Sequence, residues 1–148
     1  MVATVRATDL AYNQALGIRD APAEAEHLLE LPFAPQVANH LQTMHAAAQF
    51  SLAEAASAEC LQRHFKAALG EVFAVMRASE VQYRKPATSD LLAYGMPDEE
   101  TLSRLVDQVT RRGRGIAVIL IDLKDRTGTL TLHGKFEWFI SRAPTTPA

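Results

Sequence analysis

The chain has 148 residues, of which 48% are hydrophobic and 22% are charged, and its formal net charge is −2 at pH 7. A chain of this length buries roughly two-thirds of its unfolded surface in one core, so we expect a single domain over residues 1–148. The balanced charge excludes the strongly basic surface typical of a nucleic-acid-binding protein. A single cysteine, Cys60, excludes an internal disulfide and fits a reducing compartment.

We expect a soluble, cytoplasmic protein with no membrane partner. The first residues, MVATVRATDLAYNQALG, lack the continuous apolar region of a secretory signal. No apolar run elsewhere is long enough to span a bilayer.

The first half of the chain predicts two short elements and one long helix. Residues 10–16 have the apolar spacing of a short amphipathic helix that ends at Gly17, so we assign residues 1–25 to this helix and a connector. Residues 27–31 predict a short strand. A long helix then follows from Thr43, as its N-cap, to about Phe65. This helix is apolar on nearly all sides and carries seven alanines between Ala46 and Ala58.

From residue 71 the hydrophobic period changes from 3.6 to 2, which predicts strands. We expect strands at 71–85, with a bend in the middle, and at 91–96, 115–125 and 129–141. A helix interrupts them near 98–112, because acids occupy its first turn, an apolar stripe follows and Gly113 can end it. Residues 142–148 are predicted to be a disordered tail.

These elements predict an α+β architecture. A helix that is apolar on nearly all sides has to be surrounded, and a curved antiparallel sheet wrapped around it does so with few elements. We therefore expect the hotdog fold, with an extra N-terminal helix and the inserted helix near 98–112.

An acidic residue inside the apolar helix is the first candidate for chemistry. Glu54 shares a helix face with Phe50, Ala58 and Leu61, and residues 43–61 contain no lysine or arginine. An unpaired carboxylate on an apolar face is costly, and such groups concentrate at functional sites. Two interpretations stay open: Glu54 is a functional acid, or it points to solvent or meets an arginine of a neighbouring strand.

The start of the same helix offers a second component. Free N–H groups at Ala46 and Ala47, together with the helix dipole, could bind a carbonyl oxygen as it becomes negative. Ala46 and Glu54 are about 12 Å apart along the helix axis, so within one chain they cannot both contact one carbonyl group. If they cooperate, they do so across the interface of a homodimer.

The stretch NHLQTMHAAAQFSLAE resembles a segment of hotdog-fold acyl-CoA thioesterases, closest to the phenylacetyl-CoA and 4-hydroxybenzoyl-CoA thioesterase-like branch. That segment has Asn, five residues, His, Gly-Gly, and an acid nine residues after the His, a spacing that Asn39, His45 and Glu54 match. VQYRKPATSDLLAYG and RRGRGIAVILIDLKDRTGTLTLHGKFEWFI are similar to later strands of the family. The resemblance covers about Leu28 to Ile140.

The resemblance implies hydrolysis of an acyl-CoA thioester to free acid and CoA, without a cofactor other than the CoA of the substrate. Glu54 would be the general base or nucleophile, and the Ala46 amide would polarise the thioester carbonyl. Asn39 and His45 would order the loop, the thioester and the water. The resemblance also implies two such sites per dimer and often a tetramer, a dimer of dimers.

One departure is that the Gly-Gly of the family is Ala46-Ala47 here. An alanine amide donates as a glycine amide does, but each added methyl group narrows the approach to it. An alternative function is therefore a non-catalytic hotdog protein that binds acyl-CoA or another acyl thioester. A third function, a dehydratase, would require a paired catalytic His and acid in an arrangement that we do not find.

Basic residues near strand and helix ends are candidates for binding the CoA phosphates. We assign this role to Arg84, Lys85 and Arg114, and we assign substrate contact to Ala47. The arginines at 111–112 suit the helix C-terminus.

Other reactive residue types have simpler interpretations. We expect no metal, because the spacing of His40 and His45 matches no metal-binding signature. Cys60 is expected to pack in the core without a nearby base. His64 and His133 are expected at the surface.

Overall fold

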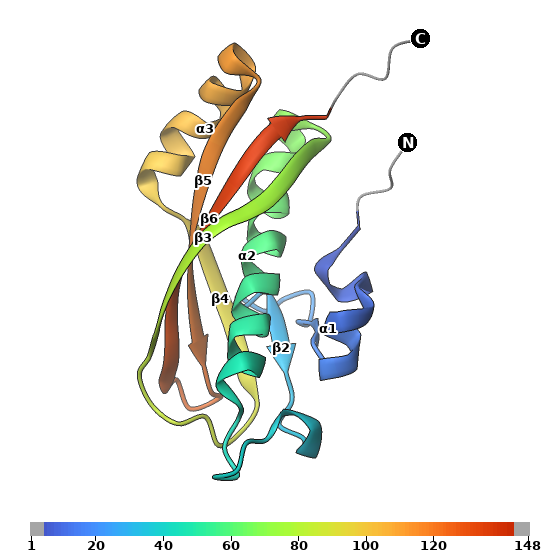
Figure 1. The fold of residues 1–148 in the computed structure, drawn as a ribbon, viewed down its shortest axis with the longest axis vertical. Helices are drawn as coiled ribbons and strands as arrows, with labels where there is room; N and C mark the ends of the chain where they lie inside the picture. The colour runs from blue at the N-terminus through green and yellow to red at the C-terminus, as the bar shows by residue number, and fades with distance from the viewer. Residues whose placement is uncertain (1–4, 144–148) are drawn as a thin grey trace.

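A six-stranded antiparallel sheet curves around one long helix (Figure 1). The computed structural model describes residues 5–143. The strand order across the sheet is β1-β2-β4-β5-β6-β3, which leaves β1 and β3 at its edges. The strands are β1 (Arg19–Asp20), β2 (Leu29–Leu31), β3 (Val72–Tyr83), β4 (Leu91–Pro97), β5 (Arg114–Lys124) and β6 (Leu130–Arg142). The predicted α+β architecture is confirmed. The sequence did not predict β1, because a strand of two residues is too short to show a hydrophobic period.

The central helix, α2 (Ala46–Leu69), begins and ends later than the sequence predicts. Its N-cap is His45, whose Nδ1 accepts a hydrogen bond from the Ala47 N–H at 3.0 Å. The prediction of Thr43 as N-cap is wrong because the preceding loop uses its side chain. Asn39 Nδ2 donates to the Thr43 hydroxyl at 2.8 Å, so that hydroxyl is held in the loop and does not cap the helix.

Small side chains on α2 let the sheet approach closely. Cys60 is fully buried, and a Cβ added to Gly95 of β4 would lie 3.5 Å from the Cys60 Cβ. Trp138 of β6 donates from Nε1 to the Ser57 hydroxyl at 3.0 Å, and this hydrogen bond joins α2 to β6. The alanine-rich sequence thus gives a helix thin enough to be enclosed.

Cys60 packs in the core as predicted, and burial raises the pKa of its thiol to about 12. The expectation that no base lies near it is wrong, because the Cys60 Sγ is 3.6 Å from Nδ1 of His64 one turn later. A thiol with so high a pKa is not a nucleophile at neutral pH. His64 is exposed, whereas His133 is partly buried and pairs with Asp122 at 2.6 Å.

The two other helices agree closely with the sequence pattern. The predicted N-terminal helix is α1 (Ala11–Leu16), and Gly17 ends it with a left-handed φ of 93°. The inserted helix is α3 (Glu99–Arg112), which Asp98 caps by accepting a hydrogen bond from the Thr101 N–H. α3 lies beside β5, near the end of the molecule where α2 ends (Figure 1). Two single turns of 3-10 helix occur at Ala7–Asp9 and Pro35–Val37.

The bend predicted within residues 71–85 is a register shift in β3 between Met76 and Ala78. At the C-terminus, Arg142 pairs with Val72, so the start of the predicted tail belongs to β6. Residue 143 follows β6 without regular structure. The rest of that prediction, residues 144–148, and the first four residues of the predicted N-terminal segment lie outside the described range. Among the helices within residues 5–143, none has the length and apolar character required to cross a membrane.

Candidate active site

Glu54 lies on the side of α2 that faces β6 and the sheet edge at β3. One turn before it, the Phe50 ring is 5.8 Å from the ring of Phe136 on β6. One turn after it, Ser57 accepts the hydrogen bond from Trp138 of the same strand. Because residues three and four apart share a helix face, Glu54 sits between these two contacts. Beyond β6 there is β3, the last strand of the sheet.

The Glu54 carboxylate is partly buried and unpaired. Within residues 5–143 it forms no hydrogen bond or ion pair, and the hydrogen bond from Ser57 goes to the Glu54 backbone carbonyl. Burial raises the pKa of the Glu54 carboxyl above its ordinary value. An arginine partner from a neighbouring strand, the alternative open from the sequence, is therefore not found in the described part of the chain. The catalytic role of Glu54 stays a prediction.

The two amides at the start of α2 differ in their availability. The Ala46 N–H has no hydrogen-bond acceptor within residues 5–143, and Ala46 is exposed. The expectation that the Ala47 N–H is also free is wrong, because His45 Nδ1 accepts it. His45 thus leaves Ala46 as the free donor of this pair. A free amide at a helix start is suited to bind a developing negative charge.

The loop before α2 is held by Asn39. Its Oδ1 accepts hydrogen bonds from the N–H groups of Leu41 and Thr43, at 2.9 and 3.0 Å. Gln42 takes a left-handed φ of 59° inside this loop. The His45 N–H donates to the Val37 carbonyl at 2.7 Å. Asn39 therefore has the geometry to order the loop, while its contact with a thioester or a water stays a prediction.

Tyr83 is a residue at this site whose role the sequence did not reveal. Its hydroxyl donates to the Ala46 carbonyl at 2.9 Å, and burial raises the pKa of the phenol. This contact ties the end of β3 to the start of α2. The sequence places a tyrosine near the end of a predicted strand. It does not show that this tyrosine contacts Ala46, because that contact depends on how β3 crosses α2.

The structure does not bring Ala46 and Glu54 together within one chain. Both lie on the continuous helix α2, about 12 Å apart along its axis. As the sequence already indicated, Ala46 and Glu54 can therefore act on one carbonyl group only if a second chain supplies one of them.

Comparison with known proteins places the chain in a family. The domain of unknown function DUF4442 matches residues 19–140, which run from β1 to within two residues of the end of β6. The chain belongs to the DUF4442 family. None of the curated proteins matches it.

Solved structures share the architecture of this DUF4442 protein at low sequence identity. A protein of unknown function from Pseudomonas aeruginosa, called a probable thioesterase, has a TM-score of 0.77 and 22% identity over 93% of this chain and 91% of that one. A thioesterase from Haemophilus influenzae has a TM-score of 0.68 and 16% identity, over 91% and 85% of the chains. A Bacillus halodurans protein with CoA has a TM-score of 0.67 and 18% identity, over 87% and 74%. These similarities confirm the hotdog fold, whereas the branch suggested by the sequence stays a prediction.

The basic residues predicted to bind CoA do not form one cluster in the DUF4442 chain. Arg84 and Lys85 are exposed and directly follow Tyr83, at the start of α2. Arg114 lies at the other end of the sheet. Tyr83 pairs with Leu132 and Arg114 with Ser141, two positions of β6 that are about 30 Å apart along the strand. One CoA phosphate group cannot contact both sets within a chain.

An apolar groove continues along the same side of α2 as Glu54. Its volume is about 610 Å³, and it begins at Leu61, about two turns beyond Glu54. Phe65 and Leu69 of α2 and Val72 of β3 also line it. Within residues 5–143 no group of three His, Cys, Asp or Glu residues is placed to hold a metal ion.

Proposed function

We propose that this DUF4442 protein is an acyl-CoA thioesterase, which hydrolyses an acyl-CoA thioester to free acid and CoA. The observation that carries the proposal is the partly buried Glu54 carboxylate, whose pKa is raised, two turns beyond the Ala46 amide at the start of the same helix. Neither group has a hydrogen-bond partner in the described range 5–143. The shared fold of a Haemophilus influenzae thioesterase and of a Bacillus halodurans protein with CoA supports it.

In this proposal Glu54 acts as a general base toward water or as a nucleophile toward the thioester carbon. A carboxylate with a raised pKa is a better base at neutral pH than an ordinary glutamate. The Ala46 N–H of the partner subunit would stabilise the oxyanion that forms when the carbonyl is attacked. The reaction then requires no cofactor, since water, base and oxyanion donor are sufficient.

The proposed homodimer is supported by the free edge of β3. This twelve-residue strand pairs with β6 on one side and with no strand of the described chain on the other. Phe73, Val75 and Tyr83 are exposed large apolar residues on it. Long edge strands with exposed apolar side chains readily pair with another chain. A partner at this edge would approach the side of α2 that carries Glu54.

The groove beyond Glu54 favours an apolar acyl group. Its volume of about 610 Å³ lies within the range of roughly 300–1,000 Å³ found for small-molecule sites. A thioester carbonyl beside Glu54 would allow the acyl chain to run toward Leu61 and Phe65.

The deciding experiment compares wild type and Glu54→Gln on a panel of acyl-CoA esters. General base catalysis contributes about 10²–10⁴-fold, so we expect kcat to fall by that factor while KM changes little. Glu99→Gln, an exposed acid at the start of α3, is the matched control and should keep the wild-type rate. An unchanged rate in Glu54→Gln would show that Glu54 is not the catalytic acid.

A second function, binding of an acyl thioester without hydrolysis, is favoured by one observation. The helix start carries Ala46-Ala47 where the related thioesterases have Gly-Gly, and the Ala47 amide is already bonded to His45. Isothermal titration with a non-hydrolysable thioether analogue of acyl-CoA separates the two functions. Binding of the analogue without turnover of any ester would support the binding function and contradict hydrolysis.

A further inference from the structure

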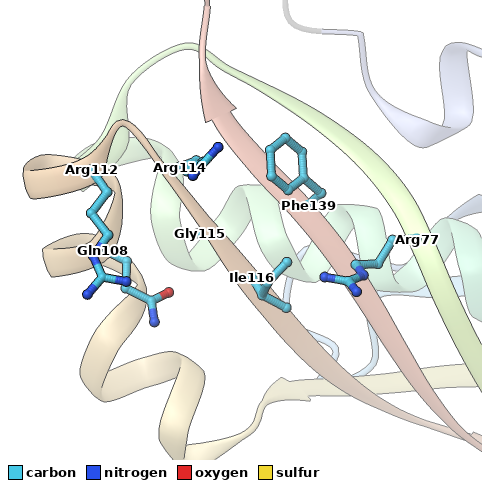
Figure 2. Close-up of a pocket in the computed structure, with 7 residues that line it drawn as sticks. All are labelled: Arg77, Gln108, Arg112, Arg114, Gly115, Ile116 and Phe139. Atoms are coloured by element: carbon cyan, nitrogen blue, oxygen red, sulfur yellow. The ribbon is translucent and has the colours of Figure 1, made fainter.

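A pocket lined by arginines lies at the end of the sheet beside α3. Its volume is about 290 Å³, and Arg77 of β3, Arg112 of α3 and Arg114 of β5 line it together with Ile116 and Phe139. Arg114 and Arg77 appear on opposite sides of the Phe139 ring (Figure 2). The pocket therefore combines several cationic groups with a small apolar floor.

This pocket opens on the face of the sheet away from α2. Ile116 and Phe139 are a cross-strand pair, so their side chains project from the same face. Their neighbours Ala117 and Trp138 form the next pair and project from the opposite face, where Trp138 bonds to α2. The sheet thus separates the pocket from α2 and from Glu54.

Two of the three arginines of the pocket have no acidic partner in the described part of the chain. Arg77 pairs with Glu137 at 3.4 Å, and within residues 5–143 neither Arg112 nor Arg114 has a carboxylate partner. The pocket therefore holds a surplus of two positive charges in a chain whose net charge is −2. Clefts lined by one sign of charge concentrate ligands of the opposite sign.

The end of α3 does not account for these cations, although the sequence assigned residues 111–112 to it. The Thr110 carbonyl accepts a hydrogen bond from Arg142 at 3.1 Å, and the Val109 carbonyl accepts one from Gly113 at 2.9 Å. Arg111 pairs with Asp107 at 2.7 Å. The carbonyl groups of the last turn of α3 thus accept hydrogen bonds from residues other than the arginines of the pocket.

We infer that this pocket binds a phosphorylated nucleotide. Guanidinium groups match phosphate oxygens in two-point hydrogen bonds, which assigns the phosphates to Arg112 and Arg114. The Phe139 ring offers a surface on which an aromatic base can stack. The apolar floor distinguishes this ligand class from inorganic phosphate. The inference does not depend on thioester hydrolysis, because it rests on a face of the sheet that Glu54 does not reach.

Titration calorimetry on the full chain tests the inference with adenosine 3′,5′-bisphosphate and with inorganic pyrophosphate. We expect the nucleotide to bind more tightly than pyrophosphate. The double variant Arg112→Gln, Arg114→Gln should weaken nucleotide binding at least about tenfold, since each charged hydrogen bond contributes about that factor. Phe139→Leu should weaken binding of the nucleotide and leave that of pyrophosphate unchanged. Arg111→Gln, which removes a neighbouring exposed arginine, should change neither.

Two results would overturn the inference: no nucleotide binding by wild type, or nucleotide binding that the double arginine variant leaves intact. Circular dichroism of each variant checks that the sheet is retained.

A competition experiment identifies the source of the nucleotide. If CoA displaces the bisphosphate and loses affinity in the double variant, the ligand is the nucleotide end of CoA. If ATP displaces it and CoA does not, the ligand is a free nucleotide. Either readout stays valid if the protein hydrolyses no thioester.

Discussion

At the scale of single residues, Glu54 is the feature that packing alone does not explain. The chain keeps a carboxylate on an otherwise small and apolar stretch of α2, without a hydrogen-bond partner in residues 5–143. Glu30 shows the contrast. Burial alone would raise the pKa of Glu30, but hydrogen bonds from His27 and Arg19 and the charge of Arg126 lower it. The buried Glu30 is thus held by hydrogen-bond donors, whereas no donor of residues 5–143 reaches the Glu54 carboxylate.

We predict that Glu54→Gln stabilises the protein at neutral pH. Because burial raises the pKa of Glu54 in the folded chain, the ionised carboxylate destabilises the fold at pH values above that raised pKa. The penalty is lost as pH falls through the folded and then the unfolded pKa. The gain should not exceed about 1 kcal/mol, since the side chain is partly solvated. Urea unfolding from pH 4 to pH 8 measures it, and a constant difference between the two proteins would contradict the prediction.

For the proposed hydrolysis, the same pKa shift predicts a pH dependence of the rate. If Glu54 must be ionised to act as base or nucleophile, kcat/KM should rise with pH through its raised pKa and then level off. The acid limb should therefore lie above the range of an ordinary glutamate. A profile of kcat/KM between pH 4 and pH 9 shows this, and an acid limb at or below that range would argue against Glu54 as the group observed.

At the scale of elements, the start of α2 decides which amide is free. His45 caps the helix and takes the Ala47 N–H, and Tyr83 bonds to the Ala46 carbonyl. Asn39 fixes the loop that delivers His45 to this position. The site is thus built from a loop, a helix start and a strand end. Together they hold in place the helix start at which the Ala46 N–H lies.

We predict that Ala46→Pro abolishes most of the activity without unfolding the helix. Proline is tolerated at the first helical position, and His45 before it has φ −58° and ψ 137°, a conformation that a following proline accepts. The substitution removes the N–H, and loss of one oxyanion donor costs about 10²–10³-fold in kcat. Steady-state kinetics measures the loss.

Two controls accompany this variant. Ala46→Val keeps the N–H while adding bulk, and Ala46→Gly introduces the glycine found at this position in the thioesterase segment that the sequence resembles. A rate in Ala46→Pro equal to that of Ala46→Val would mean that the amide plays no part. Thermal unfolding should show that all three variants fold.

At the scale of the whole molecule, the proposed chemistry is incomplete in one chain. Glu54 and Ala46 lie about 12 Å apart on one rigid helix, and β3 leaves its outer edge open beside the side of α2 that carries Glu54. A two-fold pairing of chains at that edge would create two equal sites. Each site would take its acid from one chain and its amide from the other.

We predict that two inactive variants restore activity when they share a dimer. In a mixed dimer of Glu54→Gln and Ala46→Pro, one site carries both lesions and the other carries none. Random mixing by unfolding and refolding should therefore recover about a quarter of the wild-type rate, since half of the dimers are mixed and each has one intact site. No recovery would show that acid and amide of each site belong to the same chain. Native mass spectrometry, which resolves the different masses of the two variant chains, confirms that mixed dimers formed.

The sequence by itself determined the elements other than the short β1, and it determined the candidate acid. The change of hydrophobic period at residue 71, the glycine stops at Gly17 and Gly113, and a carboxylate inside the alanine-rich helix are local patterns, and the structure keeps each of them. Local patterns suffice here because side-chain period and helix capping depend on residues a few positions apart.

Tertiary structure alone decided how these elements form a site. It placed the start of α2 at Ala46 because Asn39 engages Thr43, and it brought Tyr83 to that helix start across 37 residues of sequence. It also separated Arg114 from Arg84 by about 30 Å along the sheet. These relations follow from strand register and from which strand crosses the helix, and both depend on contacts between segments far apart in the chain.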